Sequence, residues 1–324
     1  MRAIAYLLGM AVCLSVLTGG TDLRAADESE AGFHSLFNGQ NLDGWKPWAG
    51  DEGFWRIEDG TITGESTAEK PLGHNTFLAW DNAEVDDFEL RLQFKLTGDM
   101  AKANSGIQFR GQQNPDGHVV GYQADIDLAG QWGGALYDEA GRGLLAGRGA
   151  KVTIAVDGKK TEAASDLPIS VKPGEWHEYS ITAQGNHITL KIDGKVTSEV
   201  FDDQKDPGND ANKQAERIGM LALQMHSGPP QKVQFKNIRI KRFKLTDSKK
   251  VVFIAGRPSH GWGSHEHNAG CLLLAKRLNE SGLPVIATVY RSGWPKDPTA
   301  LDNADTVVSY CDGGGGALPQ RPTG

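Results

Sequence analysis

The feature that most constrains the fold is a strict alternation of apolar and polar side chains over residues 88–96 (FELRLQFKL). Successive side chains of a β-strand point to opposite faces, so this pattern predicts a strand with one face in a core and one near solvent. We therefore expect Leu92 and Phe94 to be buried, and Arg91 and Gln93 to be less so. A register error of one residue would reverse this assignment.

The same period of two recurs along much of the chain, which favours a sandwich of short strands. Residues 187–192 (HITLKI) alternate in this way, and Asp193 with Gly194 predicts a hairpin turn into residues 195–201. Other segments with this pattern are residues 175–182, 221–225 and 232–241. Many short strands without a long helical period predict an all-β sandwich over residues 33–245.

One stretch, from Asn104 to Arg142, concentrates polar and aromatic side chains between many glycines. Residues 105–110, 119–127 and 135–137 read as short strands joined by glycine-rich turns. On the second strand Gln123, Asp125 and Asp127 share one face. An unpaired buried charge is costly, so this face is either solvated, as is common in antiparallel sheets, or part of a functional site.

Three features of the stretch favour a site over a solvated face. Arg110 and Arg142 supply positive charges that can balance the carboxylates. Trp132 and Tyr137 supply flat apolar surfaces of the kind that bind sugars. The glycines allow the backbone to approach a ligand closely.

The motifs of this stretch, NSGIQFR, GYQADID and WGGALYDEAGR, resemble those of the 3-keto-disaccharide hydrolase domain family. The resemblance continues, in the family's order, through residues 33–48, 54–65, 174–194 and 218–243. It implies a concanavalin-like jelly roll over residues 33–245, with a carbohydrate site on its concave sheet. Many members carry Glu and Gln where this chain has Gln123 and Asp125, so a catalytic role of that Glu would pass to Asp125 or be lost here.

The resemblance implies a hydrolase or lyase that acts on 3-keto-glycosides or disaccharides. The C3 carbonyl of such a sugar acidifies the hydrogen at C2, so a base can remove it and the glycoside can leave from C1. Such a site needs a base, an acid and a donor or cation for the enolate oxygen. The base or acid candidates are Asp125, Asp127, Glu139 and His226. Arg110, Arg142 or a bound divalent metal can hold the enolate, and the sequence leaves the cofactor otherwise unknown. The substrate-binding candidates are Asn104, Tyr122, Gln123, Asp127, Trp132, Tyr137 and Arg142.

A non-catalytic carbohydrate-binding jelly-roll module is the alternative, and the departure at Gln123 favours it. Such a module needs hydrogen-bonding side chains and aromatic rings but no acid and base. Two of the assignments also have structural readings. His226 can be a satisfied structural histidine, and Glu139 with Arg142 can form a surface ion pair.

The N-terminal residues 1–26 read as a secretory signal, which predicts a periplasmic or secreted protein. Arg2 precedes an apolar run over residues 4–17 that is too short for a stable membrane anchor, and small residues follow at Ala25 and Ala26. A retained anchor is the alternative, and Cys13 lacks the small residue that lipidation requires before it. The formal net charge of -7 argues against nucleic acid or an anionic membrane as partner, and carbohydrate is the expected one.

The pattern changes after residue 249 and predicts a partial α/β segment over residues 250–324. Apolar strands at residues 251–255, 284–290 and 306–310, with a helix at 268–278, favour a parallel sheet. Residues 256–278 and 310–316 resemble the start of a ThuA-like trehalose-utilisation domain, whose fold is similar to class I glutamine amidotransferases. Residues 317–324 match nothing in that resemblance, so we expect a truncated or frameshifted domain, with a short accessory segment as the alternative.

A histidine cluster follows the first of these apolar strands. His260, His265 and His267 surround Glu266, and ligands of open α/β sheets gather at the carboxyl ends of strands. Closely spaced histidines can bind a metal, and a polar substrate loop is the other reading.

Overall fold

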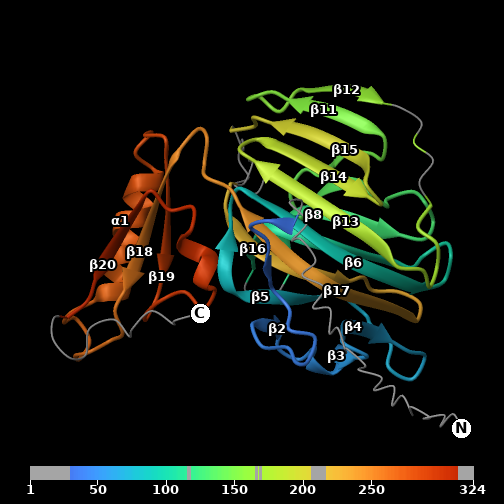
Figure 1. The fold of residues 1–324 in the computed structure, drawn as a ribbon, viewed down its shortest axis with the longest axis horizontal. Coiled ribbons are helices and arrows are strands. Elements are labelled where there is room, and N and C mark those ends of the chain that lie inside the picture. The colour runs from blue at the N-terminus through green and yellow to red at the C-terminus, as the bar shows by residue number, and fades with distance from the viewer. Residues whose placement is uncertain (1–29, 115–117, 165–166, 168–169, 206–216, 313–324) are drawn as a thin grey trace, which may run out of the picture. The chain divides into compact units, whose positions relative to one another are not determined.

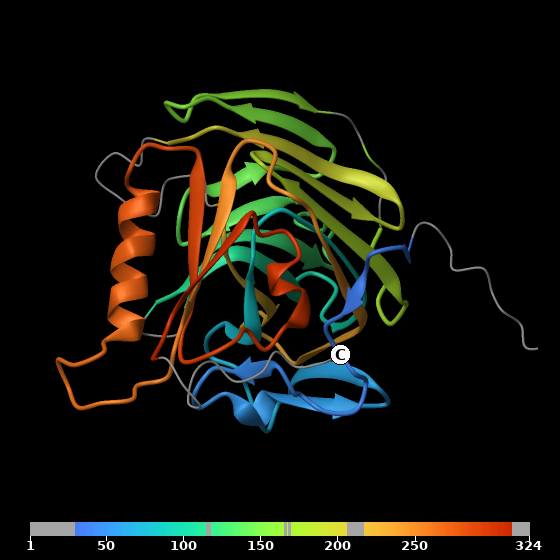
Figure 2. The same ribbon diagram turned by 60° about the vertical axis from the view of Figure 1, so that its left-hand side comes forward.

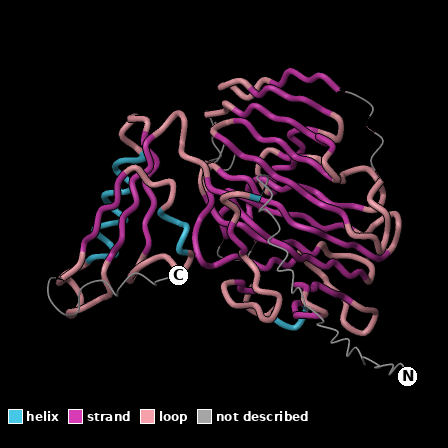
Figure 3. Tube along the Cα trace, viewed as in Figure 1, coloured by secondary structure: helices cyan, strands magenta, loops and turns pink. Residues whose placement is uncertain are grey.

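Strands dominate the fold, as Figure 3 shows for a computed structural model that describes residues 30–114, 118–164, 167, 170–205 and 217–312. The chain divides after Gly32, and the described residues from Phe33 to Asp312 form one compact unit. The predicted signal segment, residues 1–26, and the chain end, residues 317–324, lie outside the described residues.

The larger sheet of the sandwich, called the back sheet here, is antiparallel except where β11 runs parallel to β15 (Figure 1). Its strands in spatial order are β12 (Lys160–Ala164), β11 (Ala150–Ile154), β15 (Lys195–Asp202), β14 (His187–Ile192), β13 (His177–Gln184), β6 (Phe88–Gly98), β17 (Gln231–Arg242), β4 (Thr61–Ser66) and β3 (Trp55–Glu58), with β1 (His34–Ser35) on β17. The hairpin predicted at Asp193 is present between β14 and β15, and Asp193 adopts the left-handed φ of 51° that such a turn requires.

The facing sheet, called the front sheet here, carries the stretch singled out in the sequence. Its strands in spatial order are β10 (Gly143–Ala146), β9 (Leu136–Glu139), β8 (Val119–Asp127), β7 (Asn104–Gln113), β16 (Gly219–Met225), β5 (Thr76–Val85) and β2 (Trp45–Pro47). A short 3₁₀ turn at Glu52–Phe54 precedes β3. The predicted all-β jelly-roll sandwich is therefore confirmed.

The main core lies between the two sheets and forms one apolar cluster with members from both. Along β6 the odd and even positions alternate between buried and half-buried, as the sequence predicts, with Leu92 and Phe94 fully buried. The rings of Phe88 from the back sheet and Phe109 from the front sheet meet edge to face, with centroids 5.9 Å apart. Interdigitated side chains of this kind fix the register between the sheets.

After the sandwich the chain forms a small parallel sheet, called the C-terminal sheet here. It consists of β19 (Val285–Tyr290), β18 (Lys249–Ala255) and β20 (Thr306–Tyr310), with β18 in the centre. Helix α1 (His267–Asn279) packs against it through Cys271 and Ala275 (Figure 2). A 3₁₀ turn at Pro298–Leu301 precedes β20. The predicted parallel α/β segment is confirmed over the described residues, whereas nothing shows that it belongs to the ThuA-like family.

Buried polar contacts join the C-terminal sheet to the corner between β5 and β6. The Lys250 ammonium lies 2.6 Å from the Asp86 carboxylate, and both side chains are at most 1% exposed. Asn303 donates to the other oxygen of Asp86 at 2.8 Å, and Arg242 donates to Asp297 at 2.9 Å. Within the described residues, no helix is long and apolar enough to cross a membrane.

The packing of β6 generates a prediction about stability. Replacing Leu92 with Ala leaves a cavity in a fully buried site, so Leu92→Ala should lower the free energy of unfolding by about 2–5 kcal/mol. The neighbouring half-buried Gln93 faces away from the core, and Gln93→Ala should cost much less, about 0.5 kcal/mol. Urea denaturation of both variants measures the difference, and equal losses would contradict the register.

Candidate functional site

The polar row on β8 lies on the front-sheet face that points away from the main core, yet it is not solvated. Gln123, Asp125 and Asp127 are each less than 5% exposed. Every residue of β8 is buried, because neighbouring strands and the segment that follows β8 cover both of its faces. The solvated-face alternative is therefore wrong, and each polar group of the row needs a partner.

Strand register explains how the row is packed. On one level Gln108, Gln123 and Tyr137 lie directly opposite one another across β7, β8 and β9, and on the next level Gly106 lies opposite Asp125. A Cβ at Gly106 would lie 2.8 Å from the Gln123 side chain. Glycine at this position leaves room for the Gln123 side chain to extend along β8, over β7, towards Asp125.

Hydrogen bonds fix the orientation of the Gln123 amide. Its Oε1 accepts from the amide nitrogens of Gln108, at 2.9 Å, and Gln224, at 2.8 Å. Its Nε2 must then point the other way, and it donates to Oδ1 of Asp125 at 2.6 Å. Three glutamines on adjacent strands thus hold one carboxyl group in place.

The electrostatics at Asp125 are unusual for a carboxyl group. Burial raises its pKa to about 8, and the nearby carboxylates of Glu139 and Asp127 act in the same direction. The hydrogen bond from Gln123 opposes this shift without cancelling it. A carboxyl group with such a pKa can gain and lose a proton near neutral pH, which is a requirement for general acid–base catalysis.

Asp125 opens into a cavity of about 280 Å³, whose size suits a sugar ring. The lining residues are Asn75, Asn104, Gln123, Asp125, Trp132, Tyr137, Glu139 and His226. A second cavity of about 460 Å³ shares Asn104, Trp132 and His226 with the first and continues past Asp127 and Pro229. The two cavities therefore meet at three shared side chains.

The remaining polar groups of the cavity wall are also oriented by the backbone. His226 donates through Nδ1 to the Ser227 carbonyl at 2.7 Å, which leaves Nε2 as its reactive nitrogen. Asn75 accepts the Ser227 N–H at 2.9 Å through Oδ1, which leaves its amide nitrogen as a donor. Glu139 contacts Nε2 of His118 at 3.1 Å. Within the described part of the chain, the buried Oδ1 of Asn104 has no partner.

Asp127 positions the aromatic wall of the cavity. Its carboxylate accepts the backbone N–H groups of Gln131 at 2.9 Å, Trp132 at 3.0 Å and Gly133 at 2.6 Å. This contact fixes the segment after β8 and places the Trp132 ring edge to face against Tyr137, with centroids 6.0 Å apart. Asp127 is therefore a structural carboxylate for the loop that carries Trp132.

The structure does not bring Arg110 to this cavity, which corrects the sequence-based assignment. Its guanidinium is 1% exposed and donates to the Asp86 carbonyl at 2.7 Å, the Gly185 carbonyl at 2.8 Å and the Asp87 carboxylate at 2.9 Å. Its φ of 50° at an irregularity of β7 turns the side chain away from Asp125.

Arg142 and Tyr122 also lie elsewhere, in a buried network with Asp138 and Asp202. Arg142 donates to Asp138 at 2.5 Å and lies 2.7 Å from Asp202, which also accepts from the Tyr122 hydroxyl at 2.6 Å. These acidic groups raise the pKa of Arg142, whereas burial raises the pKa of Tyr122. The alternative reading, a surface ion pair between Arg142 and Glu139, is wrong, because Arg142 pairs with Asp138 and Asp202.

Sequence reasoning missed three residues of the site, Asn75, Gln108 and Gln224. Period-two alternation is the signal that could have placed Gln108 on the same face as Gly106, but only register shows that it meets Gln123. The predicted metal histidines belong to the C-terminal segment, where Asp312 joins them.

Comparison with known families assigns most of the chain. Residues 32–241 match the 3-keto-alpha-glucoside-1,2-lyase-like domain, so the chain belongs to this family. No curated protein is similar enough to the chain to count as a match.

Solved structures with a similar fold are distant in sequence. A candidate glycosyl hydrolase from Parabacteroides distasonis has 21% identity and a TM-score of 0.46, covering 67% of this chain and 96% of its own. The carbohydrate-binding module CBM66 from Bacillus subtilis has 14% identity and a TM-score of 0.40, covering 61% and 95%. A Bacillus subtilis protein with a galectin-like fold has 11% identity and a TM-score of 0.42, covering 62% and 90%.

The buried position of Arg110 generates a prediction about stability. Arg110→Ala should lower the free energy of unfolding by about 3–5 kcal/mol, because it leaves the Asp87 carboxylate buried without its cation. The exposed pair of Lys172 and Glu175 provides the control, and Lys172→Ala should cost less than about 1 kcal/mol. Chemical denaturation distinguishes them, and a neutral Arg110→Ala would return this residue to the list of catalytic candidates.

The raised pKa of Asp125 generates a prediction about pH. Since the folded state holds the proton up to about pH 8, this group's contribution to stability is complete below its unfolded pKa of about 4. As pH rises from the unfolded pKa of about 4 to the folded pKa of about 8, the contribution falls by about 1.4 kcal/mol per pH unit. Above about pH 8 it is lost. Asp125→Asn should therefore gain stability relative to wild type as pH rises from 5 to 7. Urea denaturation at both values tests this, and a constant difference would refute the raised pKa.

Proposed function

We propose that the chain binds 3-keto-glycosides in the cavity of the front sheet and cleaves their glycosidic bond, with Asp125 as the base. The observation that carries the proposal is a buried carboxyl group on a cavity wall, with a pKa raised to about 8 and an orientation fixed by Gln123. Membership of the 3-keto-alpha-glucoside-1,2-lyase-like family supports the substrate class.

The proposed reaction starts with proton transfer from C2 of the sugar to Asp125. The electrons of that bond move to the C3 carbonyl and form an enolate, and they then form a double bond between C1 and C2 as the C1–O bond breaks. The leaving oxygen takes a proton from a general acid. Addition of water to the unsaturated ketone completes a net hydrolysis, whereas release before this addition makes the enzyme a lyase.

His226 is the side chain best suited to act as the acid. Its Nδ1 is committed to the Ser227 carbonyl, so the imidazolium form would carry its mobile proton on Nε2. Neutral donors on the wall, the amides of Asn75 and Asn104, can stabilise the enolate oxygen in place of the two arginines. Glu139 raises the pKa of Asp125 and so helps to keep the base near neutrality.

The two adjoining cavities suit a substrate with two units. Trp132 lies between them as a shared wall, so one ring can occupy the smaller cavity beside Asp125 while the leaving group extends into the larger one. Aromatic faces bind the apolar faces of sugars, and Trp132 with Tyr137 provides two perpendicular surfaces.

A non-catalytic carbohydrate-binding module remains the second candidate, because the carboxyl and amide of positions 123 and 125 are exchanged relative to many family members. The exchange moves the carboxyl by two residues along the same face of β8, where the Gln123 amide donates to it in this chain. The cavity would then use Asp125 only as a hydrogen-bonding group.

A substitution at Asp125 separates the two candidates. Asp125→Asn keeps the shape and removes the base, so turnover of 3-keto-trehalose and 3-keto-glucosides should be lost while binding of the sugar persists. Wild-type kcat/KM should rise with pH through an apparent pKa near 8. Product release measured with and without divalent cations, beside calorimetric binding, provides both readouts. Full turnover in Asp125→Asn would remove it from the mechanism, and absence of turnover with wild-type binding would favour the binding module.

The aromatic wall gives a further test that both candidates share. Trp132→Ala should weaken sugar binding by about 1–3 kcal/mol because the apolar area that the indole buries against the sugar is lost. Phe33 provides a matched aromatic control outside the cavity lining, and Phe33→Ala should leave binding unchanged. Unchanged binding in Trp132→Ala would contradict the placement of the substrate.

A further inference from the structure

The C-terminal sheet brings two separate segments of the chain together at one edge. Strands β18 and β20 are parallel, with Ala255 opposite Tyr310, so both chains leave the sheet at the same end. Gly256 donates to the Tyr310 carbonyl at 2.8 Å, and a Cβ at Gly256 would lie 2.6 Å from Cys311. Glycine therefore permits the close approach that places Asp312 beside the histidine segment.

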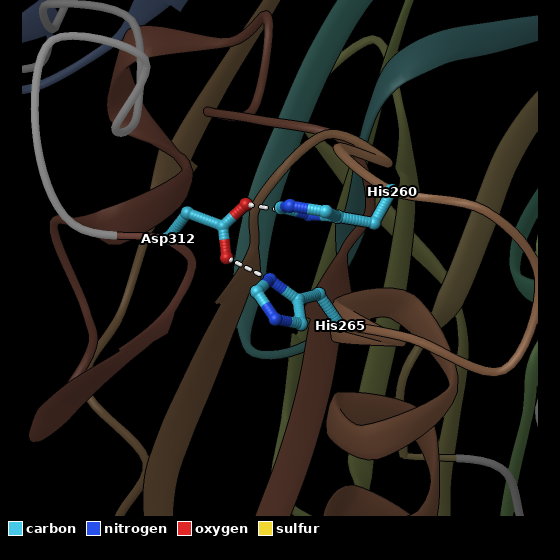
Figure 4. Close-up of side chains that lie close together, drawn as sticks. All are labelled: His260, His265 and Asp312. Atoms are coloured by element: carbon cyan, nitrogen blue, oxygen red, sulfur yellow. Dashed lines mark hydrogen bonds and ion pairs between the residues drawn. The ribbon is translucent and has the colours of Figure 1, made fainter.

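Two histidines and this carboxylate converge, as Figure 4 shows. One side-chain donor atom each of His260, His265 and Asp312 lies within 4.8 Å of the other two. Nδ1 of His265 is 2.5 Å from one Asp312 oxygen, and Nδ1 of His260 is 3.7 Å from the other. His265 adopts a left-handed φ of 53°, which is uncommon for a residue with a side chain and typical of ligand clamps.

A third imidazole, that of His267, lies beside the cluster. Its Nδ1 lies 3.2 Å from the Arg257 carbonyl, which can only accept, so Nδ1 carries a hydrogen. Its Nε2 faces an Asp312 oxygen at 3.4 Å, so the His267 ring borders the cluster.

We propose that His260, His265 and Asp312 form a binding site for a late first-row divalent cation, with Zn²⁺ as the probe that best fits the donors. A set of two imidazole nitrogens and one carboxylate oxygen binds Zn²⁺ in preference to Mg²⁺ and Ca²⁺, because these hard ions take oxygen ligands. His267 borders this cluster and is not one of the three proposed ligands. The sequence pointed to the histidines, and the structure adds the carboxylate.

The spacing of the donors is close to what the ion requires. Tetrahedral Zn²⁺ with bonds of about 2.0–2.1 Å holds its ligand atoms about 3.3 Å apart. The contacts of Asp312 with His265 and His260, at 2.5 Å and 3.7 Å, bracket this value. Movements of the donor atoms by less than about 1.5 Å would bring them to this spacing. All three side chains are at least partly exposed, so an ion can enter.

Three protein ligands leave the fourth position of a tetrahedral ion for water or a substrate atom. Sites of this composition are the catalytic kind, whereas structural zinc sites use four protein ligands. Trp262 lies in the segment between His260 and His265, and its side chain is fully exposed. It gives this segment an apolar surface. The site would therefore be a second chemical centre with ligands independent of the front-sheet cavity.

The test is a titration of the full chain, without a polyhistidine tag, by Zn²⁺ in a calorimeter. Wild type should bind one Zn²⁺ per chain, and His265→Ala and Asp312→Asn should each weaken binding at least about tenfold. Co²⁺ in place of Zn²⁺ should show the intense visible absorption of a tetrahedral site. His187→Ala removes a partly exposed histidine of the back sheet and serves as the matched control, with unchanged affinity expected.

Several results would overturn the proposal. One is that wild type forms no one-to-one complex with Zn²⁺. Another is that His265→Ala and Asp312→Asn both bind Zn²⁺ with wild-type affinity. Loss of binding in Asp125→Asn would place the ion in the front-sheet cavity and would equally refute it. Thermal unfolding without metal checks that each variant folds, and His260→Ala replaces His265→Ala if the latter does not.

Discussion

The sandwich depends on a buried acidic corner, Asp86 and Asp87, between β5 of the front sheet and β6 of the back sheet. Both side chains are completely buried, and each meets one cation, Lys250 and Arg110. Burial raises the pKa of Asp87 and lowers that of Lys250, so desolvation opposes both pairs. Pairs of this kind add little net stability over an apolar core, but removing one partner is costly, and they therefore specify one arrangement of the elements.

This corner also explains why the charges of the candidate site differ from the sequence-based expectation. Arg110 pairs with Asp87 and donates to two carbonyls, and Arg142 pairs with Asp138 and Asp202. The cavity is left with carboxyl groups, amides and one histidine, without an arginine on its wall. Asp125 consequently lacks a cationic partner among the described residues, and its pKa rises because burial is not compensated. The same allocation of cations thus specifies one arrangement of the scaffold and leaves the pKa of Asp125 raised.

Two kinds of polar centre result, each built on a different type of sheet. In the antiparallel front sheet, cross-strand register lines up Gln108 and Gln123 and fixes the Asp125 carboxyl. In the parallel C-terminal sheet, strands that end together bring His260, His265 and Asp312 to one edge. Strand register positions the side chains of the first centre within a sheet, so that centre is buried. The second centre is formed by loops that leave the same end of parallel strands, so it is open to solvent.

The sequence by itself determined the strands, their buried faces and the family, because period-two alternation and motif order are local properties. It placed β8, β14 and β20 at the bounds that the structure shows, and it put Gln123 and Asp125 on one face. Only the tertiary structure decided which partner each charge meets. Arg110 turns away at a backbone irregularity, and Gln224 and Asp312 join their sites from 101 and 47 residues away in the chain. Such pairings depend on register and on strand ends, which no local pattern encodes.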